Sequence, residues 1–185
     1  MTRLVPVFDV DGTLLDSDEA LIAPFVALGV VDLPPFGLVM GDACDAVGIS
    51  VEDYVRLYDT AAALPFPGVF DLLNRLDRWA ICSNKHPSSG HDELSRLDWK
   101  PEVAMFTDAF GGPKRLGPVL EAMALEGRDV IFIGDTAHDR SCARDAGAQF
   151  ALAGWNPRAE SVPGDVVLTH PLDLLEILDE KSETP

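Results

Sequence analysis

The sequence predicts an α/β protein with a doubly wound, Rossmann-like parallel sheet and a small helical cap inserted after the first strand. Three observations predict this fold. Short apolar runs alternate along the chain with segments whose apolar residues recur at helical spacing. Such alternation is typical of a parallel sheet covered by helices. It is interrupted once, after the first run, by a stretch with helical patterns and no convincing strand.

Six apolar runs are predicted to be strands. The first, Val5–Phe8, stops at acidic residues and a glycine, which indicates a buried strand followed by a loop. The run Val130–Ile133 stops at Gly134 and Asp135 in the same way. The other four runs are Trp79–Cys82, Val103–Thr107, Gln149–Ala153 and Val166–Leu168.

Helical patterns fill the intervals between these runs. Prolines mark the starts of two of the helices, because proline is tolerated in a first helical turn. The predicted helices are Val69–Leu76, a short helix after Pro87, a helix around Pro118 to Ala124, Asp139–Ala146, and a last one over Leu172–Ile177.

The stretch from Asp16 to Phe66 is predicted to be a separate helical insertion. Two groups of apolar residues share helical faces within it, namely Leu21, Phe25 and Leu28, and Val51, Val55 and Tyr58. We therefore predict a core of residues 1–15 and 66–185 and a cap of residues 16–65.

Composition narrows the class of protein. Of the 185 residues, 47% are hydrophobic and 24% charged, which is a globular balance. The formal net charge of −17 would repel nucleic acid and anionic lipid. No apolar run approaches the roughly 20 residues that span a bilayer, and the first run is too short for a signal-peptide core. We expect a soluble, cytoplasmic monomer or homodimer with no nucleic-acid or membrane partner.

The acidic pair Asp9 and Asp11 follows the first strand. Two carboxylates this close repel each other unless a cation separates their roles, and Mg²⁺ prefers oxygen ligands. An ionised Asp9 could then attack phosphorus, while Asp11 exchanges protons with the leaving alcohol and with water. Gly12 permits the unusual backbone needed for close approach. The alternative is an ordinary Asp-Gly turn.

A second acidic pair, Asp135 and Asp139, follows the fourth strand. Both side chains could reach one cation at a strand end. The alternative is that Asp135 or Thr136 caps the following helix. Capping would account for one acidic residue here but does not need two.

Groups suited to binding phosphate follow the second and third strands. Ser83 offers a hydroxyl, Asn84 and the backbone beside it offer N–H groups, and Lys114 offers a positive charge. The alternative for Ser83 is a loop residue that caps the next helix, and the alternative for Lys114 is a solvated surface lysine. Since the carboxyl ends of parallel strands share one edge of the sheet, all four clusters should converge there.

Taken in this order, the four clusters resemble the motifs of the haloacid dehalogenase (HAD) superfamily. Asp9 to Thr13 is similar to its Asp-x-Asp-Gly-Thr motif, Ser83 to its second and Lys114 to its third. Gly134 to Asp139 is similar to the fourth, Gly-Asp-x-x-x-Asp. Details that resemble its phosphoglycolate phosphatase-like branch are Pro67-Gly68-Val69, Ser83-Asn84-Lys85, Ala146-Gly147-Ala148 and the position of the cap.

This resemblance implies a phosphohydrolase that uses Mg²⁺ and an aspartyl-phosphate intermediate. Asp9 would be the nucleophile and Asp11 the general acid/base. The metal ligands would be Asp9, the backbone carbonyl of Asp11, Asp135, and Asp139 directly or through water. Ser83, Asn84 and Lys114 would bind the substrate phosphate. Family members often have prolines just after the lysine that this chain lacks, so Arg115 could share the role of Lys114.

Other functions remain open. A sugar phosphomutase of the same superfamily, a phosphoacceptor signalling module and a pseudoenzyme that binds partners all fit part of the pattern. A dehalogenase is disfavoured because such enzymes lack the acid found here as Asp11. The substrate is expected to be a small, lightly charged phosphorylated metabolite, because the cap is acidic and Arg56 is its only Lys or Arg.

Overall fold

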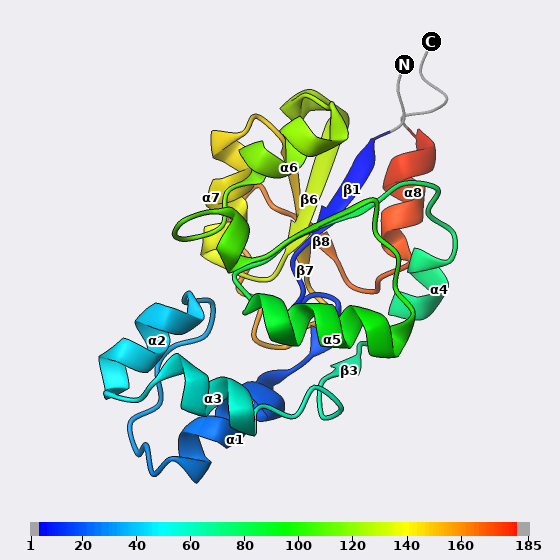
Figure 1. The fold of residues 1–185 in the computed structure, drawn as a ribbon. Coiled ribbons are helices and arrows are strands. Elements are labelled where there is room, and N and C mark those ends of the chain that lie inside the picture. Colours follow the sequence, from blue (N-terminus) through cyan, green and yellow to red (C-terminus); the bar gives the residue numbers. More distant parts are fainter. Residues whose placement is uncertain (1–3, 181–185) are drawn as a thin grey trace.

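A computed structural model describes residues 4–180 and shows a six-stranded sheet with helices on both faces (Figure 1). The strand order is β5-β4-β1-β6-β7-β8, and every neighbouring pair is parallel. The predicted fold class is thus confirmed. The ends of the predicted core, residues 1–3 and 181–185, lie outside the described residues.

All six predicted strands are present. The run that began at Val103 ends earlier than predicted, because Thr107 begins a short 3₁₀ helix, η1 (Thr107–Ala109). The strands of the sheet are β1 (Val5–Phe8), β4 (Ala80–Cys82), β5 (Val103–Met105), β6 (Val130–Gly134), β7 (Gln149–Ala153) and β8 (Val166–Leu168).

The helices of the core also fall in the predicted intervals. They are α4 (Val69–Leu73), α5 (Pro87–Leu97), α6 (Leu116–Met123), α7 (Ala137–Asp145) and α8 (Asp173–Glu180), with a 3₁₀ turn, η2 (Gly127–Asp129), before β6. Pro87 is the first residue of α5 and Pro118 lies in the first turn of α6, where their missing N–H groups leave no hydrogen bond unmade.

Two apolar layers enclose the sheet. Along β6, Val130 and Phe132 pack with α6 and α7, while Ile131 and Ile133 pack on the opposite face with α4 and α8. Successive side chains of a strand point to opposite faces, so a strand covered on both sides is apolar throughout. This is why the strands appear in the sequence as continuous apolar runs.

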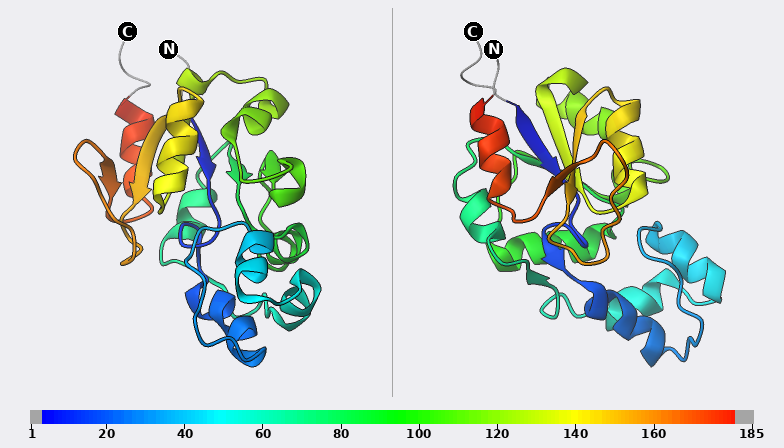
Figure 2. Two further views of the ribbon diagram at one scale, coloured as in Figure 1. Left: turned by 90° about the vertical axis from the view of Figure 1, so that its left-hand side faces the viewer. Right: turned by 180° about the vertical axis from the view of Figure 1, so that it is seen from behind.

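Three helices form the inserted segment, which we call the cap (residues 16–65). They are α1 (Asp18–Ala27), α2 (Met40–Val47) and α3 (Val51–Leu57), and they group at one end of the sheet (Figure 2). Contrary to the prediction of no strand, a short ribbon joins the cap to the core. Its strands β2 (Leu15–Asp16) and β3 (Leu64–Pro65) pair antiparallel. Two-residue strands are too short to show an alternating pattern in the sequence.

The ribbon of β2 and β3 places the cap over the edge of the six-stranded sheet that contains the carboxyl ends of its strands. The chain leaves β1 at its carboxyl end, enters the cap through β2 and returns through β3. Among residues 4–180, no helix has the length and apolar character needed to cross a membrane.

Candidate active site

Asp9 lies immediately after β1, near the middle of the sheet. Its backbone N–H donates to Ile133 O at 2.9 Å, which fixes the start of the loop against β6. Its carboxylate is buried, accepts a hydrogen bond from Val10 N at 2.7 Å and lies 2.7 Å from Lys114 Nζ. The side chain that sequence analysis identified as a nucleophile is therefore held in place by a backbone amide and a lysine.

The loop after Asp9 turns tightly at Gly12. This glycine has a φ of +75°, as its predicted role requires, and its N–H donates to Leu15 O at 2.8 Å. A Cβ at this position would collide with Asp135 Oδ2 and lie 2.8 Å from Asn156 Nδ2. Gly12 therefore allows β1 and β6 to bring their acidic residues together.

We expect Gly12→Ala to lower kcat/KM by at least about 100-fold, because displacing reacting groups by an ångström has that scale of effect. The matched control is Gly29→Ala. Gly29 has a similar φ of +82° but has open space where a Cβ would lie. It should cost about 1–2 kcal/mol of stability and leave kcat/KM unchanged. Steady-state kinetics and urea denaturation of both variants check this. Equal activity in the two would contradict the proposed crowding at Gly12.

Asp135 and Asp139 lie after β6, at the start of α7. Asp135 accepts from Thr13 Oγ1 at 3.3 Å and from Asn156 Nδ2 at 3.0 Å. Asp139 accepts from Thr136 N at 2.9 Å, and Thr136 Oγ1 accepts in return from Asp139 N. Thr136 and Asp139 thus cap the start of α7. The other carboxylate oxygen of Asp139 points toward Lys114.

Lys114 connects the two acidic pairs. Its Nζ lies 2.7 Å from Asp9 Oδ2 and 2.5 Å from Asp139 Oδ1, and its side chain is buried. Burial by itself would lower the pKa of Lys114, but Asp139 and Asp9 outweigh it and raise that pKa. Arg115 instead donates to Phe110 O at 3.0 Å. Of these two neighbours, Lys114 is the one that contacts the acids.

Ser83 and Asn84 follow β4 as predicted, but their side chains have different hydrogen-bond partners. Ser83 is buried, and its hydrogen bonding lowers the pKa of Asp9 against the larger effect of burial. Asn84 Oδ1 accepts from Lys114 N at 2.7 Å, and Asn84 Nδ2 donates to Gly37 O of the cap at 3.1 Å. Asn84 thus ties the lysine-bearing loop to the cap.

Three buried carboxylates lie together at this site, and Lys114 forms ion pairs with two of them. Asp9, Asp135 and Asp139 each offer an oxygen, and these oxygens lie within 4.8 Å of one another. Burial raises the pKa of Asp9 to about 6 and that of Asp135 to about 7. Lys114 and the more distant Arg158, whose Nη2 lies 3.8 Å from Asp135 Oδ2, do not balance these acids fully. A divalent cation would supply the missing positive charge. The residues present fit a divalent metal ion.

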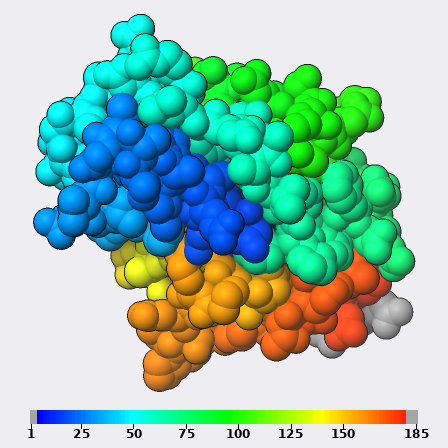
Figure 3. Space-filling model, turned by 90° about the horizontal axis from the view of Figure 1, so that it is seen from below, coloured from blue at the N-terminus to red at the C-terminus, as the bar shows by residue number. Residues whose placement is uncertain are grey.

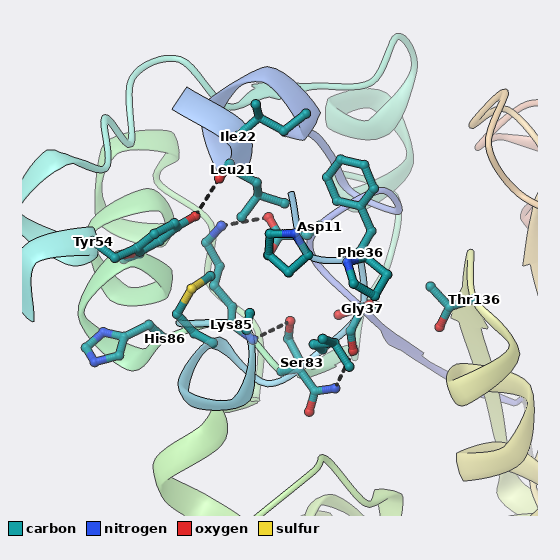
Figure 4. A pocket seen from close by; sticks show the side chains of 18 of the residues that line it. Asp11, Leu21, Ile22, Phe36, Gly37, Tyr54, Ser83, Lys85, His86 and Thr136 are labelled. Carbon is teal, nitrogen blue, oxygen red and sulfur yellow. Dashed lines mark hydrogen bonds and ion pairs between the residues drawn. The ribbon is translucent and has the colours of Figure 1, made fainter. Parts of the chain in front are cut away.

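A second buried network surrounds Asp11. Lys85 Nζ lies 2.7 Å from Asp11 Oδ1 (Figure 4). The same ammonium lies 3.1 Å from Glu93 Oε1 and 2.9 Å from Tyr58 Oη. Burial raises the pKa of Glu93 to about 7, against the lowering effect of Lys85. Asp11 thus faces Lys85 and the cap residue Tyr58, whereas the other three acids cluster around Lys114.

The loop after β7 also reaches the site, and sequence analysis missed it. Asn156 Nδ2 donates to Gly12 O at 2.8 Å, and Trp155 Nε1 donates to Thr13 O at 2.9 Å. Arg158 Nη2 lies 3.8 Å from Asp135 Oδ2. Polar residues that directly follow a predicted strand indicated each of the other clusters. The same signal follows Ala153 and would have found these residues.

The sequence of this chain also matches a known family of hydrolases. Residues 39–153 match the family model described as haloacid dehalogenase-like hydrolase. This chain belongs to that family. Its similarity to named phosphatases agrees with the phosphoglycolate phosphatase-like branch indicated by the motifs.

Individual relatives are similar over most of their length. The chain is 26% identical to an N-acetylmuramic acid 6-phosphate phosphatase of Pseudomonas aeruginosa, covering 94% of this chain and 93% of the relative. It is 24% identical to a phosphoglycolate phosphatase of Xylella fastidiosa, covering 83% and 81%. A haloacid dehalogenase-like hydrolase of Streptococcus pneumoniae superposes with a TM-score of 0.73 at 25% identity, covering 96% and 99%.

Proposed function

We propose that this chain is a magnesium-dependent phosphatase that hydrolyses a small phosphomonoester through an aspartyl-phosphate on Asp9. The observation that carries this proposal is the buried cluster of Asp9, Asp135 and Asp139 with Lys114 at the strand ends. Named relatives act on N-acetylmuramic acid 6-phosphate and on phosphoglycolate, which supports a small phosphorylated substrate.

Asp9, Asp135 and Asp139 would hold the magnesium ion through their carboxylates, and Asp11 through its backbone carbonyl. The bound ion would offset the excess negative charge of the acids and orient the phosphate. Asp139 already accepts from Thr136 and contacts Lys114, so a water-mediated contact suits it as well as a direct one.

In the first step an oxygen of Asp9 attacks phosphorus, and the bond from phosphorus to the alcohol oxygen breaks. Lys114 holds the carboxylate in place and stabilises charge on the transferring phosphoryl group. Ser83 lies beside Asp9 and donates to a phosphate oxygen. Asn84 supports phosphate binding by accepting a hydrogen bond from the backbone N–H of Lys114, which positions that lysine.

Asp11 protonates the leaving alcohol and then takes a proton from the water that hydrolyses the aspartyl-phosphate. Its carboxylate is positioned for both transfers by Lys85, whose Nζ lies 2.7 Å from Asp11 Oδ1. Because Tyr58 of the cap also donates into this network, the position of the cap is linked to that of Asp11.

Activity is expected to disappear in excess chelator and to return when magnesium is added. The physical reason is that Lys114 and the more distant Arg158, which also pairs with Asp18, carry too little positive charge to balance three buried acids. The measurement is hydrolysis of an aryl phosphate before and after metal is restored. Circular dichroism of the chelated protein serves as the control for folding. Full turnover in a metal-free sample would contradict the assigned roles of Asp135 and Asp139.

A further inference from the structure

One pocket lies between the cap and the strand ends, and its two walls differ in chemistry. The core wall carries the acids, Ser83 and Lys114. The cap wall is largely apolar and includes Leu21, Ile22, Phe25, Leu38 and Met40. In Figure 4, Leu21, Ile22 and Phe36 lie on the cap side of Asp11, where the alcohol part of a bound phosphomonoester would extend.

Each lysine and arginine that lines this pocket within the described chain is already paired with a carboxylate. The pairs on the core side are Lys114 with Asp9 and Asp139, and Lys85 with Asp11 and Glu93. His86 also lines the pocket, but burial lowers its pKa, so its ring is neutral at neutral pH.

Arg158 is the remaining pocket cation, and it is held by the cap. Its guanidinium forms a two-point ion pair with Asp18 at the start of α1. The same group stacks on Phe36 at 4.1 Å from the ring centroid. The space-filling view shows this beginning of the cap against the chain segment that follows β7 (Figure 3). The ion pair with Asp18 therefore neutralises the charge of Arg158, which could otherwise bind a second anionic group of a substrate.

On the basis of the proposed phosphatase activity, we propose that the substrate is a phosphomonoester whose alcohol part is apolar and carries no second anionic group. The phosphate can be held by Lys114 and the acid-bound metal, but a carboxylate or second phosphate in the pocket would find no free cation. Moving an unpaired charge out of water is unfavourable, whereas apolar surface gains free energy on burial.

The first test compares benzyl phosphate with para-carboxybenzyl phosphate on the wild-type protein. These substrates differ by one carboxylate far from the reacting bond. We expect kcat/KM to be at least about tenfold higher for benzyl phosphate. A series of straight-chain alkyl phosphates should also improve, by up to about fourfold for each added methylene. Equal rates, or a preference for the carboxylated substrate, would overturn this inference and leave the phosphatase proposal standing.

The second test adds a free cation to the cap wall. Leu38→Lys places one in the pocket, and Leu57→Lys is the matched control, because the two leucines are 40% and 42% exposed and only Leu38 lines the pocket. The preference for benzyl phosphate should fall at least about threefold in Leu38→Lys and stay unchanged in Leu57→Lys.

Asp18→Asn provides an independent variant should Leu38→Lys fail to fold. It releases Arg158 and should shift the preference in the same direction. An unchanged preference in folded Asp18→Asn and Leu38→Lys would overturn the charge argument. Absence of turnover on every phosphomonoester by wild-type protein with magnesium would instead refute the proposed function, and this inference with it.

Discussion

Asp9→Asn should lower kcat for an aryl phosphate by at least about 10⁴-fold, the scale seen when an enzymatic nucleophile is removed. An amide is a poor nucleophile and cannot form the aspartyl-phosphate. The substitution keeps the shape of a buried side chain that contacts Val10 N and Lys114 Nζ, so the fold should survive. Initial rates at saturating substrate measure the effect.

Two controls make the Asp9 result specific. Asp71→Asn changes an exposed acid on α4 and should leave kcat unchanged. Rapid quenching of wild-type protein during turnover, followed by peptide mass spectrometry, should find one phosphoryl group on the peptide that contains Asp9. Near-normal turnover by Asp9→Asn, or phosphate on a different peptide, would refute the assigned nucleophile.

Lys114→Met should impair both activity and stability. Methionine fills similar apolar space but leaves Asp9 and Asp139 without their ammonium partner. Removing one member of a buried ion pair commonly costs about 3–5 kcal/mol, and we expect a loss of that order without metal. Activity should fall at least about 100-fold, because charge on the phosphoryl group is no longer stabilised.

The matched variant for this prediction is Lys100→Met. Lys100 lies 2.8 Å from Asp98, but both side chains are largely exposed, and exposed pairs contribute little. Urea denaturation in chelator and turnover with magnesium should separate the two variants. Wild-type stability and turnover in Lys114→Met would show that the buried pairs have no role in either.

Much of the fold was predictable because the sheet is covered on both faces. Strands such as β6 then appear as uninterrupted apolar runs that end at glycine or acidic residues. The ribbon of β2 and β3 was not predictable in this way. Its two-residue strands are held by their pairing across the base of the cap, and a local pattern does not report such pairing.

The site was predictable to the extent that its residues follow strands. Asp9, Ser83, Lys114, Asp135 and Asp139 were identified from position and residue type, and the structure brings them to one edge of the sheet. Their detailed roles in catalysis remain predictions. Asn84 shows the limit of this reasoning, since a loop amide gives no sign that it will bridge Lys114 and Gly37.

The sequence by itself determined the sheet, the inserted helices and the order of acids, hydroxyl and lysine along the chain. The tertiary structure decided which charges are paired and which wall of the pocket is apolar. Lys85 and Asp11 are 74 residues apart, and Arg158 and Asp18 are 140 residues apart. The first pair depends on how β1 and β4 lie side by side in the sheet, and the second on how the cap packs against the core. Such pairing therefore leaves no local pattern in the sequence.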